Sequence, residues 1–578
     1  MARGWIVKLK ESQPQSVVRL AAAAMPSDGA ASQRNRLWQA TQRQRVGMLT
    51  HKPTAFGANV VRAGRLMSMA EAEAEAARLR QDPDVEWVEV NVIERQMALT
   101  PVSATTVATP PNDLFYAQQV WLGDRTAALA GVANFPDAWA AMAGQQVYPV
   151  TVAVLDTGTL AHPELSGRLY PGYDFVSEVE YSRDGDGIDP DPTDPGDYLT
   201  STQKANNSLL YPDECDVGPN SWHGFSILNM LAARTNNSTF GAGILAPLPE
   251  GMPWALPVRV GTVCGADRSD IVEGMLWAAG VSYQGSPGLT NNPLPARVIS
   301  LSFGSTGICS ATIYSQVVAT LKQRGTLLVA SAGNGNSSNV GDVTPTVPAS
   351  CPGVLAVTSL NQRGTKAEYA NFVQTSGEQW GLAVSAGDTS DVNDSAVLVL
   401  TNDAQFTSAS SSFSMTRLYG TSFAAPQAAG VAALMLALNP ALTVDQVLSQ
   451  ITASARSWVD VDTDLSTSGQ FFDVAGTCAV GATGACRCTD STCGSGVLDA
   501  GQAVRDIIAA LPGTITPFEP PAVTASYFVP DRTQTSPTSS GGGGAMTWPW
   551  GLALYMLLAG TWLASRVNAR ASIRIGRR

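Results

Sequence analysis

The central part of the chain, residues 112–511, alternates short apolar, β-branched runs with stretches of helical pattern. The apolar runs are VTVAVLD (150–156), WALPVRV (254–260), ARVISLSFG (296–304), GTLLVASAGN (325–334) and GVLAVTSL (353–360). Continuously apolar strands separated by helices are typical of a parallel sheet that is covered on both faces. We therefore predict an α/β domain with a doubly wound, mainly parallel sheet. Ligand sites in such sheets lie beyond the carboxyl ends of the strands.

Different patterns flank this domain. Residues 1–97 combine a strand WIVKL, an acidic helix MAEAEAEAARLR and a second strand in DPDVEWVEVN, which predicts a small α+β domain. The Thr- and Pro-rich segment 98–111 is interpreted as a linker, as is the Pro/Thr/Ser/Gly segment 512–546. No apolar signal-peptide core precedes the first strand, so a signal peptide is not visible.

The C-terminal segment TWPWGLALYMLLAGTWLAS, residues 547–565, is uncharged and long enough to cross a bilayer. Five arginines lie in the tail 566–578, which predicts that the tail is cytoplasmic and that the preceding chain lies outside. The alternative is a buried core helix, but the preceding linker and the following arginines favour a transmembrane helix.

The charge balance and the cysteines restrict the class of protein. The chain has 36 Lys plus Arg against 48 Asp plus Glu, a net charge of −12, which argues against a nucleic-acid binder. Eight cysteines in loop-like surroundings favour disulfides and an oxidising compartment. A zinc site in the last four is the alternative, although their spacing lacks the usual Cys-x2-Cys pairs. The cysteines are Cys215, Cys264, Cys309, Cys351, Cys478, Cys486, Cys488 and Cys493.

Three motifs place a reactive side chain at the end of an apolar segment. TVAVLDTG ends a strand in Asp156, NSWHGFSILNMLAA has His223 at the entry to an apolar helix, and YGTSFAAP has Ser422 before another. Each motif alone is better explained by a turn former or a helix cap than by catalysis. The other two histidines are His51, outside this domain, and His162, in a His-Pro turn.

Taken together, the order Asp, His, Ser and the surrounding motifs resemble the subtilisin-like serine peptidases. PARVISLSFG (295–304), LLVASAGN (327–334), VPASCPGVLAVTSL (347–360) and GTSFAAP (420–426) occur in the matching order, and the resemblance covers residues 112–511. The sequence departs from the family pattern at Phe225 and Ser226, where Thr-His is usual, and at Gln427, where His is common.

The resemblance implies an endopeptidase that hydrolyses proteins and peptides without a catalytic cofactor. It implies Ser422 as nucleophile, His223 as general base, Asp156 as the residue that orients the imidazole, and Asn334 as an oxyanion donor. It also implies that substrate binds at two segments, whose residues are Ser302, Phe303 and Gly304, and Ala332 and Gly333. An inactive, peptidase-like surface binding or structural module is the alternative function.

The flanking segments also resemble those of this family. Residues 1–97 resemble an inhibitory pro-domain that assists folding, occupies the cleft and is removed autocatalytically. The glycines, apolar helix and arginines at the C-terminus resemble a bacterial sorting tail, cut by a rhomboid-type sorting protease. A permanent membrane anchor is the alternative. These resemblances imply an exported zymogen at the surface of, or secreted from, a bacterium.

The segment DGDGIDPDPTDPGD, residues 184–197, packs six aspartates into a Pro/Gly loop. Closely spaced carboxylates repel one another, which favours a structural Ca²⁺ held by Asp184, Asp186 and Asp189; a solvated acidic turn is the alternative. The family resemblance further implies disulfides Cys215–Cys264 and Cys309–Cys351. The last four cysteines allow three pairings, and the sequence does not choose among them.

Overall fold

A computed structural model defines the protein over most of its first 526 residues. The described residues are 2–10, 27–54, 57–96, 111–208, 210–212, 215–249, 253–284, 289–307, 309, 312–335, 346–373, 378–391, 393–467, 476–479, 486–513, 515 and 517–526. The predicted transmembrane helix, the tail, most of both linkers and the glycine run lie outside them.

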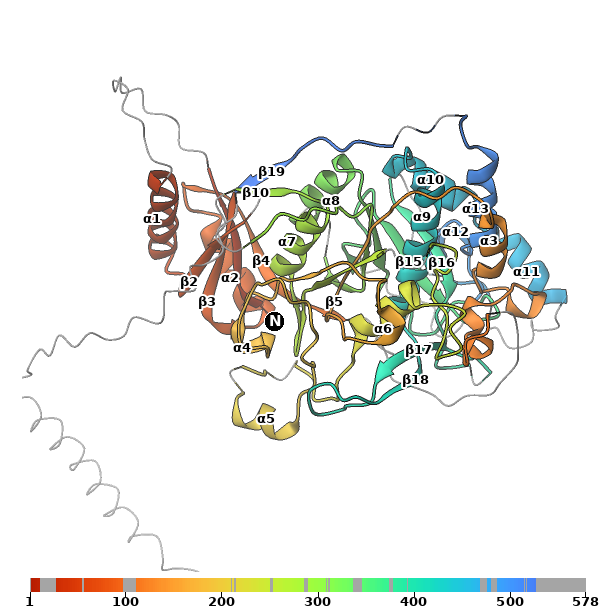
Figure 1. Ribbon diagram of the computed structural model, residues 1–578. Coiled ribbons are helices and arrows are strands. Elements are labelled where there is room, and N and C mark those ends of the chain that lie inside the picture. The colour runs from red at the N-terminus through yellow and green to blue at the C-terminus, as the bar shows by residue number, and fades with distance from the viewer. Residues whose placement is uncertain are drawn as a thin grey trace, which may run out of the picture. The chain divides into compact units, whose positions relative to one another are not determined.

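The centre of the protein is a seven-stranded sheet in which every pair of neighbours is parallel (Figure 1). The predicted parallel sheet is therefore confirmed. The strands, in spatial order, are β16 (Trp380–Ser385), β15 (Leu355–Leu360), β13 (Leu327–Ser331), β11 (Val298–Leu301), β5 (Val152–Asp156), β7 (Ala255–Arg259) and β6 (Tyr173–Asp174).

Alternate residues of strand β5 enter two different cores, as burial on both faces requires. Val152 and Val154 of β5 pack in one cluster, while Ala153 and Leu155 pack in another. The first cluster includes residues of α3 (Phe135–Met142), α6 (His223–Ala232), α9 (Ala425–Leu438), α10 (Val444–Ala453) and α13 (Ala500–Ala509). The second includes residues of α7 (Arg268–Ala278) and α8 (Tyr314–Gln323).

Shorter elements connect and extend this core. The helices are α4 (Val179–Ser182), α5 (Ser201–Asn206), α11 (Trp458–Thr467) and α12 (Asp490–Cys493). The strands are β8 (Gly261–Thr262), β9 (Gly265–Asp267), β10 (Ser282–Gln284), β12 (Phe303–Thr306), β14 (Thr346–Val347), β17 (Val397–Asn402), β18 (Phe413–Leu418) and β19 (Thr524–Ser526).

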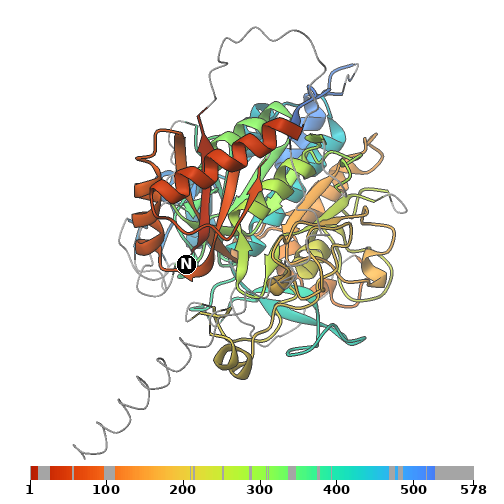
Figure 2. The same ribbon diagram turned by 90° about the vertical axis from the view of Figure 1, so that its left-hand side faces the viewer.

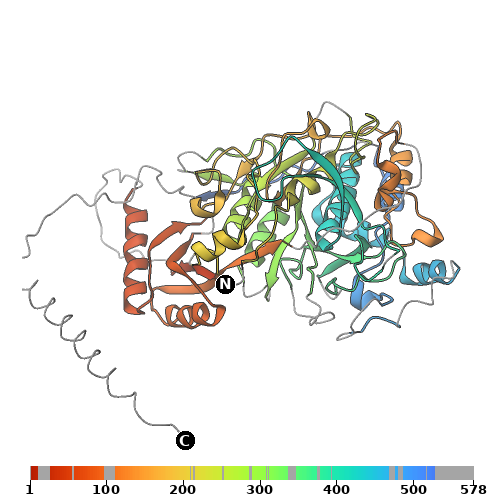
Figure 3. The ribbon, with the colours of Figure 1, turned by 90° about the horizontal axis from the view of Figure 1, so that it is seen from below.

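The N-terminal segment, here called the N-terminal module (residues 2–96), forms an antiparallel layer that joins the larger domain through β4. Its strands lie in the order β4 (Val85–Gln96), β1 (Ala2–Leu9), β3 (Ala58–Met67) and β2 (Thr50–Pro53). Two helices, α1 (Ser27–Arg43) and α2 (Met69–Leu79), cover one face of it (Figures 2 and 3). Trp5 and Val7 face these helices, whereas Ile6 enters the core that contains α7 and α8.

Two local features differ from the sequence-based expectation. The run 296–304 is two strands, not one, because β11 ends at Leu301 and β12 turns away to pair with β14 and β4. Helix α1 carries so many polar residues that its pattern did not predict it. Within the described residues, the helical stretch that is long and apolar enough to span a bilayer is Thr421–Leu438, and it is wholly buried in the core.

Candidate active site

The carboxyl end of β5 and the start of α6 meet at a buried acid–imidazole pair. Asp156 is the last residue of β5 and His223 the first of α6, and each is at most 2 % exposed. His223 Nδ1 lies 2.8 Å from Asp156 Oδ1 and 2.9 Å from Oδ2. The backbone N–H of Thr157 also donates to Oδ1. This contact fixes the imidazole plane and directs its Nε2 away from the carboxylate.

Ser422 lies in a short 3₁₀ turn, Thr421–Phe423, immediately before α9. No side-chain cap hydrogen bond is present at either helix start, so Ser422 does not serve as a helix cap. The next residue, Phe423, packs its ring 5.4 Å from that of His223. Ser422 Oγ and His223 Nε2 are both buried, and neither is hydrogen-bonded to another described residue. A catalytic role is one physical reason for a buried polar atom to have no hydrogen-bond partner.

Asn334 is held by the residue next to Ser422. Its Oδ1 accepts hydrogen bonds from both the backbone N–H and the hydroxyl of Thr421, each at 3.0 Å. The Thr421 hydroxyl in turn accepts from the backbone N–H of Gly333 at 3.1 Å. Because Thr421 engages the amide oxygen, the two donors of Asn334 lie on its Nδ2 atom, away from these contacts.

Strands β12 and β9 of the larger domain pair with β4, the last strand of the N-terminal module. Ser302 donates its hydroxyl proton to the carbonyl oxygen of Ser422 at 3.1 Å, which ties β12 to the 3₁₀ turn. The next residues of β12, Phe303 and Gly304, pair antiparallel with Gln96 and Arg95 of β4. Strand β4 also pairs with β9, through Ile93 and Glu94. The end of the N-terminal module is therefore an extended strand that pairs with two strands of the larger domain.

The sequence profile of the subtilase family matches residues 149–486, more than half of the chain, and spans Asp156, His223, Asn334 and Ser422. The chain belongs to the subtilase family.

Known subtilases cover most of this chain. It is 34 % identical over 417 residues to an extracellular protease of Xanthomonas campestris pv. campestris, and the match covers 71 % of this chain and 62 % of that protein. An extracellular basic protease of Dichelobacter nodosus is 30 % identical, with 79 % of this chain and 64 % of the relative covered. A solved protease structure from Pseudoalteromonas arctica is 33 % identical, with a TM-score of 0.54, and covers 69 % of this chain and all of that one. The chain thus spans less than two thirds of the two extracellular proteases.

The departures from the family pattern are accommodated by packing in this subtilase. The ring of Phe225 packs against His162 and Phe413, and the hydroxyl of Ser226 donates to the carbonyl oxygen of Leu400. Gln427 is buried in α9 and donates its amide protons to the carbonyl oxygens of Ser385 and Phe423. These contacts leave the Asp156–His223 pair undisturbed.

The acidic loop 184–197 does not bring its three proposed calcium ligands together in a cluster. Asp184 forms an ion pair with Arg259, which also pairs with Asp174. Burial opposes the charge on Asp184, but the hydroxyl of Ser182 and the guanidinium of Arg259 outweigh it and lower the Asp184 pKa. Among the described residues, the grouping of three potential ligand atoms is one of cysteines, not of these aspartates. Calcium binding stays a prediction.

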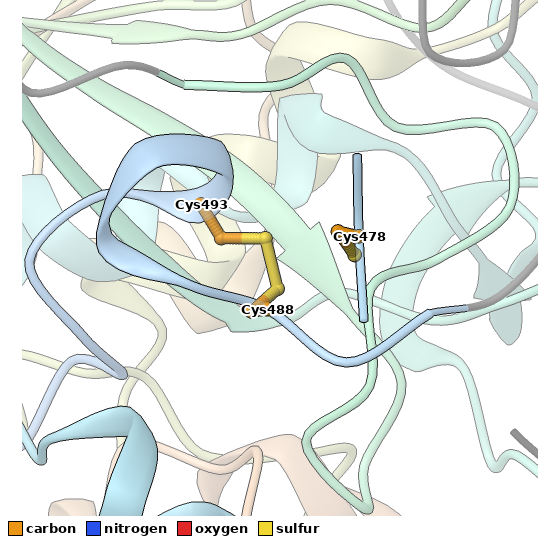
Figure 4. A group of neighbouring side chains, drawn as sticks. All are labelled: Cys478, Cys488 and Cys493. Carbon is orange, nitrogen blue, oxygen red and sulfur yellow. A yellow bond between two sulfur atoms is a disulfide. The ribbon is translucent and has the colours of Figure 1, made fainter. Parts of the chain in front are cut away.

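All eight cysteines form disulfides. The pairs include Cys215–Cys264 and Cys309–Cys351, which the family resemblance implies. The remaining four pair as Cys478–Cys486 and Cys488–Cys493. Figure 4 shows Cys478 beside the bonded pair Cys488 and Cys493; the three sulfurs lie within 4.8 Å of one another. Their sulfurs are consumed in disulfides, so this group is not a zinc site in this state.

Four residues that support the acid–imidazole pair were not singled out from the sequence. They are two hydroxyl residues, Thr157 and Ser221, and two aspartates of the acidic loop, Asp194 and Asp197. The sequence did carry a signal, since Thr157 follows Asp156 directly and Ser221 lies two residues before His223. Burial and the neighbouring charge of Asp197 raise the pKa of Asp194 to about 7.

Proposed function

We propose that this subtilase is a serine endopeptidase, made as a zymogen and exported, that hydrolyses protein substrates through Asp156, His223 and Ser422. The observation that carries the proposal is a pair of buried reactive atoms, Ser422 Oγ and His223 Nε2, that no described residue satisfies. The Asp156–His223 contact at 2.8 Å supports the same assignment. A binding module would have no need for such unpaired groups beside an oriented imidazole.

In the proposed reaction, Ser422 Oγ attacks the carbonyl carbon of the scissile peptide bond. His223 Nε2 accepts the hydroxyl proton and then delivers it to the leaving amine. Asp156 holds Nδ1–H and stabilises the imidazolium. The amide group of Asn334 and the backbone N–H of Ser422 donate to the oxyanion of the tetrahedral intermediate. Water then hydrolyses the acyl-enzyme, and no cofactor takes part in any step.

We propose that the N-terminal module is the inhibitory pro-domain, cleaved within or next to residues 98–111. Its last strand pairs with β12 and β9, the position that an extended substrate would take by adding a strand. A group of ion pairs joins the module to the larger domain: Arg3–Asp267, Arg62–Asp267, Arg62–Glu178, Lys52–Asp270 and Arg268–Glu89. These buried pairs favour a tightly held inhibitor.

Export is supported by the names of the two relatives and by the four disulfides, which need an oxidising compartment. We propose that residues 547–565 anchor the precursor in the membrane and that a rhomboid-type protease removes them. The intact mass of the exported protein separates the two outcomes, because a permanent anchor retains residues 546–578. Structural Ca²⁺ at the acidic loop remains a second proposal. Equal thermal stability in EDTA and in excess calcium would argue against it.

The central experiment compares the purified precursor with its Ser422→Ala variant. We expect the wild type to lose its N-terminal module, to digest casein and to react with a fluorophosphonate probe, whereas Ser422→Ala stays full-length and inert. Ser408→Ala, which changes an exposed serine, is the matched control and should behave as wild type. If wild type and Ser422→Ala are processed and digest casein equally, the proposal fails.

A further inference from the structure

Two hydroxyl residues connect the catalytic pair to the acidic loop in the same way. The hydroxyl of Thr157 accepts a hydrogen bond from the backbone N–H of Gly224 at 3.0 Å and donates to Asp194 Oδ2 at 2.6 Å. Thr157 directly follows Asp156, and Gly224 directly follows His223. The contact therefore joins the backbone beside one catalytic residue to the backbone beside the other.

The second connection runs through Ser221. Its hydroxyl accepts from the backbone N–H of His223 at 3.3 Å and donates to Asp197 Oδ2 at 2.6 Å. The backbone N–H of Ser221 donates to Asp197 Oδ1 at 2.7 Å. The carboxylate of Asp197 thus holds both the side chain and the backbone of Ser221, two residues before α6 begins at His223.

These contacts supply acceptors for the first backbone N–H groups of α6. The first N–H groups of a helix lack intrahelical acceptors. Trp222, which precedes His223, has a left-handed backbone with φ of 47°, and its own side chain makes no capping hydrogen bond. The two hydroxyls supply acceptors for His223 N–H and Gly224 N–H. The aspartates fix the orientation of each hydroxyl, because a proton that is donated to a carboxylate leaves the oxygen lone pairs facing the helix N–H groups.

Asp194 is shielded from solvent, and Asp197 is half-buried. Asp194 is 2 % exposed and also accepts from the backbone N–H of Gly196 at 2.9 Å. Burial raises the pKa of Asp197, against the hydrogen bonds from Ser221 and the charge of His223. Loss of either carboxylate would leave the hydroxyl of Thr157 or of Ser221 free to rotate, and a shift of the imidazole would follow.

We propose that Asp194 and Asp197 are positioning residues that act through Thr157 and Ser221 to fix His223 between Asp156 and Ser422. The proposal rests on the peptidase function above. It assigns part of the acidic loop to catalysis and separates these two aspartates from the candidate calcium ligands Asp184, Asp186 and Asp189. A positioning role predicts a loss in the chemical step, with substrate binding at β12 and β9 unchanged.

The test uses the processed enzyme, with the concentration of active sites determined by fluorophosphonate titration. We expect Thr157→Val to lower kcat per titrated site about 100-fold, the effect of a misplacement on the order of 1 Å, with KM within about threefold of wild type. Asp194→Asn and Asp197→Asn should lower kcat about tenfold, because each retains the shape but loses one acceptor. Thr157→Ser keeps the hydroxyl and should restore kcat to near the wild-type value.

The matched control is Asp191→Asn, which should leave kcat unchanged. Asp191 is an exposed aspartate of the same loop, and its carboxylate accepts from the backbone N–H and the hydroxyl of Thr193. Thermal unfolding of each variant in a Ser422→Ala background separates positioning from folding, since a purely structural role moves the unfolding midpoint and not kcat per titrated site.

Two results would overturn the proposal. One is wild-type kcat in Thr157→Val and Asp197→Asn, and the other is a Thr157→Ser enzyme as slow as Thr157→Val. A wild type that neither digests casein nor reacts with the probe overturns the peptidase function as well.

Discussion

Arg95 of the N-terminal module lies opposite Gly304 of β12 in an antiparallel pair, close to Ser302, whose hydroxyl is hydrogen-bonded to Ser422. Two residues earlier in β4, Ile93 lies opposite Asp267 of β9. One strand therefore bridges two strands of the subtilase domain close to the candidate nucleophile. The module and an extended substrate would compete for the same backbone donors and acceptors.

The ion pairs of Arg62, of which the one with Asp267 is buried, should control how tightly the module is held. Arg62 contacts Asp267 at 2.8 Å and Glu178 at 3.2 Å, and Arg62→Ala leaves both carboxylates with fewer partners. Breaking a buried pair typically costs about 3–5 kcal/mol. We expect casein hydrolysis to begin much earlier after processing in Arg62→Ala than in wild type. Arg65→Ala is the control, because exposed Arg65 pairs within the module with Glu71 and Glu75. An unchanged delay in Arg62→Ala would contradict the prediction.

Asn334 offers a substitution that separates its two roles. Asn334→Asp keeps the oxygen that accepts from Thr421 but removes the amide donors, whereas Asn334→Ala removes both. Loss of one oxyanion donor typically lowers kcat about 10²–10³-fold. We expect losses of this size in both variants, with KM little changed, in steady-state hydrolysis of a peptide substrate. Full activity of Asn334→Asp would show that the residue only holds Thr421.

The disulfides should differ in their contribution to stability because they close loops of different length. Cys309–Cys351 joins residues 42 positions apart and Cys488–Cys493 residues 5 apart. Chain-entropy estimates give about 4 kcal/mol for the first and about 2 kcal/mol for the second. Double alanine variants, each in a Ser422→Ala background, should show this order in denaturant unfolding. The reverse order would indicate that packing around Cys488 and Cys493 dominates.

The stability of the folded state should fall between about pH 4 and pH 7 in part through Asp394. Burial, with the charges of Asp388 and Asp391, raises the pKa of Asp394 to about 7. The folded state then binds this proton more tightly than the unfolded state, so the stabilisation present below the ordinary carboxyl pKa is lost as the pH rises through 7. Asp394→Asn should flatten this dependence in thermal unfolding of the Ser422→Ala protein. An identical pH profile would contradict the assignment.

The features that could be predicted from the sequence are those that a local hydrophobic pattern controls. Strand β5 and helix α9 follow from their apolar runs, and the parallel arrangement follows from alternation of strands with helices. The break at Ser302 did not follow, because β12 pairs with β4 and β14, and Ser302 contacts Ser422, 120 residues away. Asp194 and Asp197 were not distinguished from the other aspartates of the acidic loop, since burial depends on which segments fold over the loop.

The sequence by itself was enough to single out Asp156, His223, Asn334 and Ser422. Each lies next to a strand or helix that its local hydrophobic pattern predicts. The tertiary structure alone decided which carboxylates support them. Thr157 reaches Asp194 across 37 residues and Ser221 reaches Asp197 across 24. Hydrogen bonds between buried side chains depend on the distance and angle of atoms brought together by folding, and that geometry is not written in the local sequence.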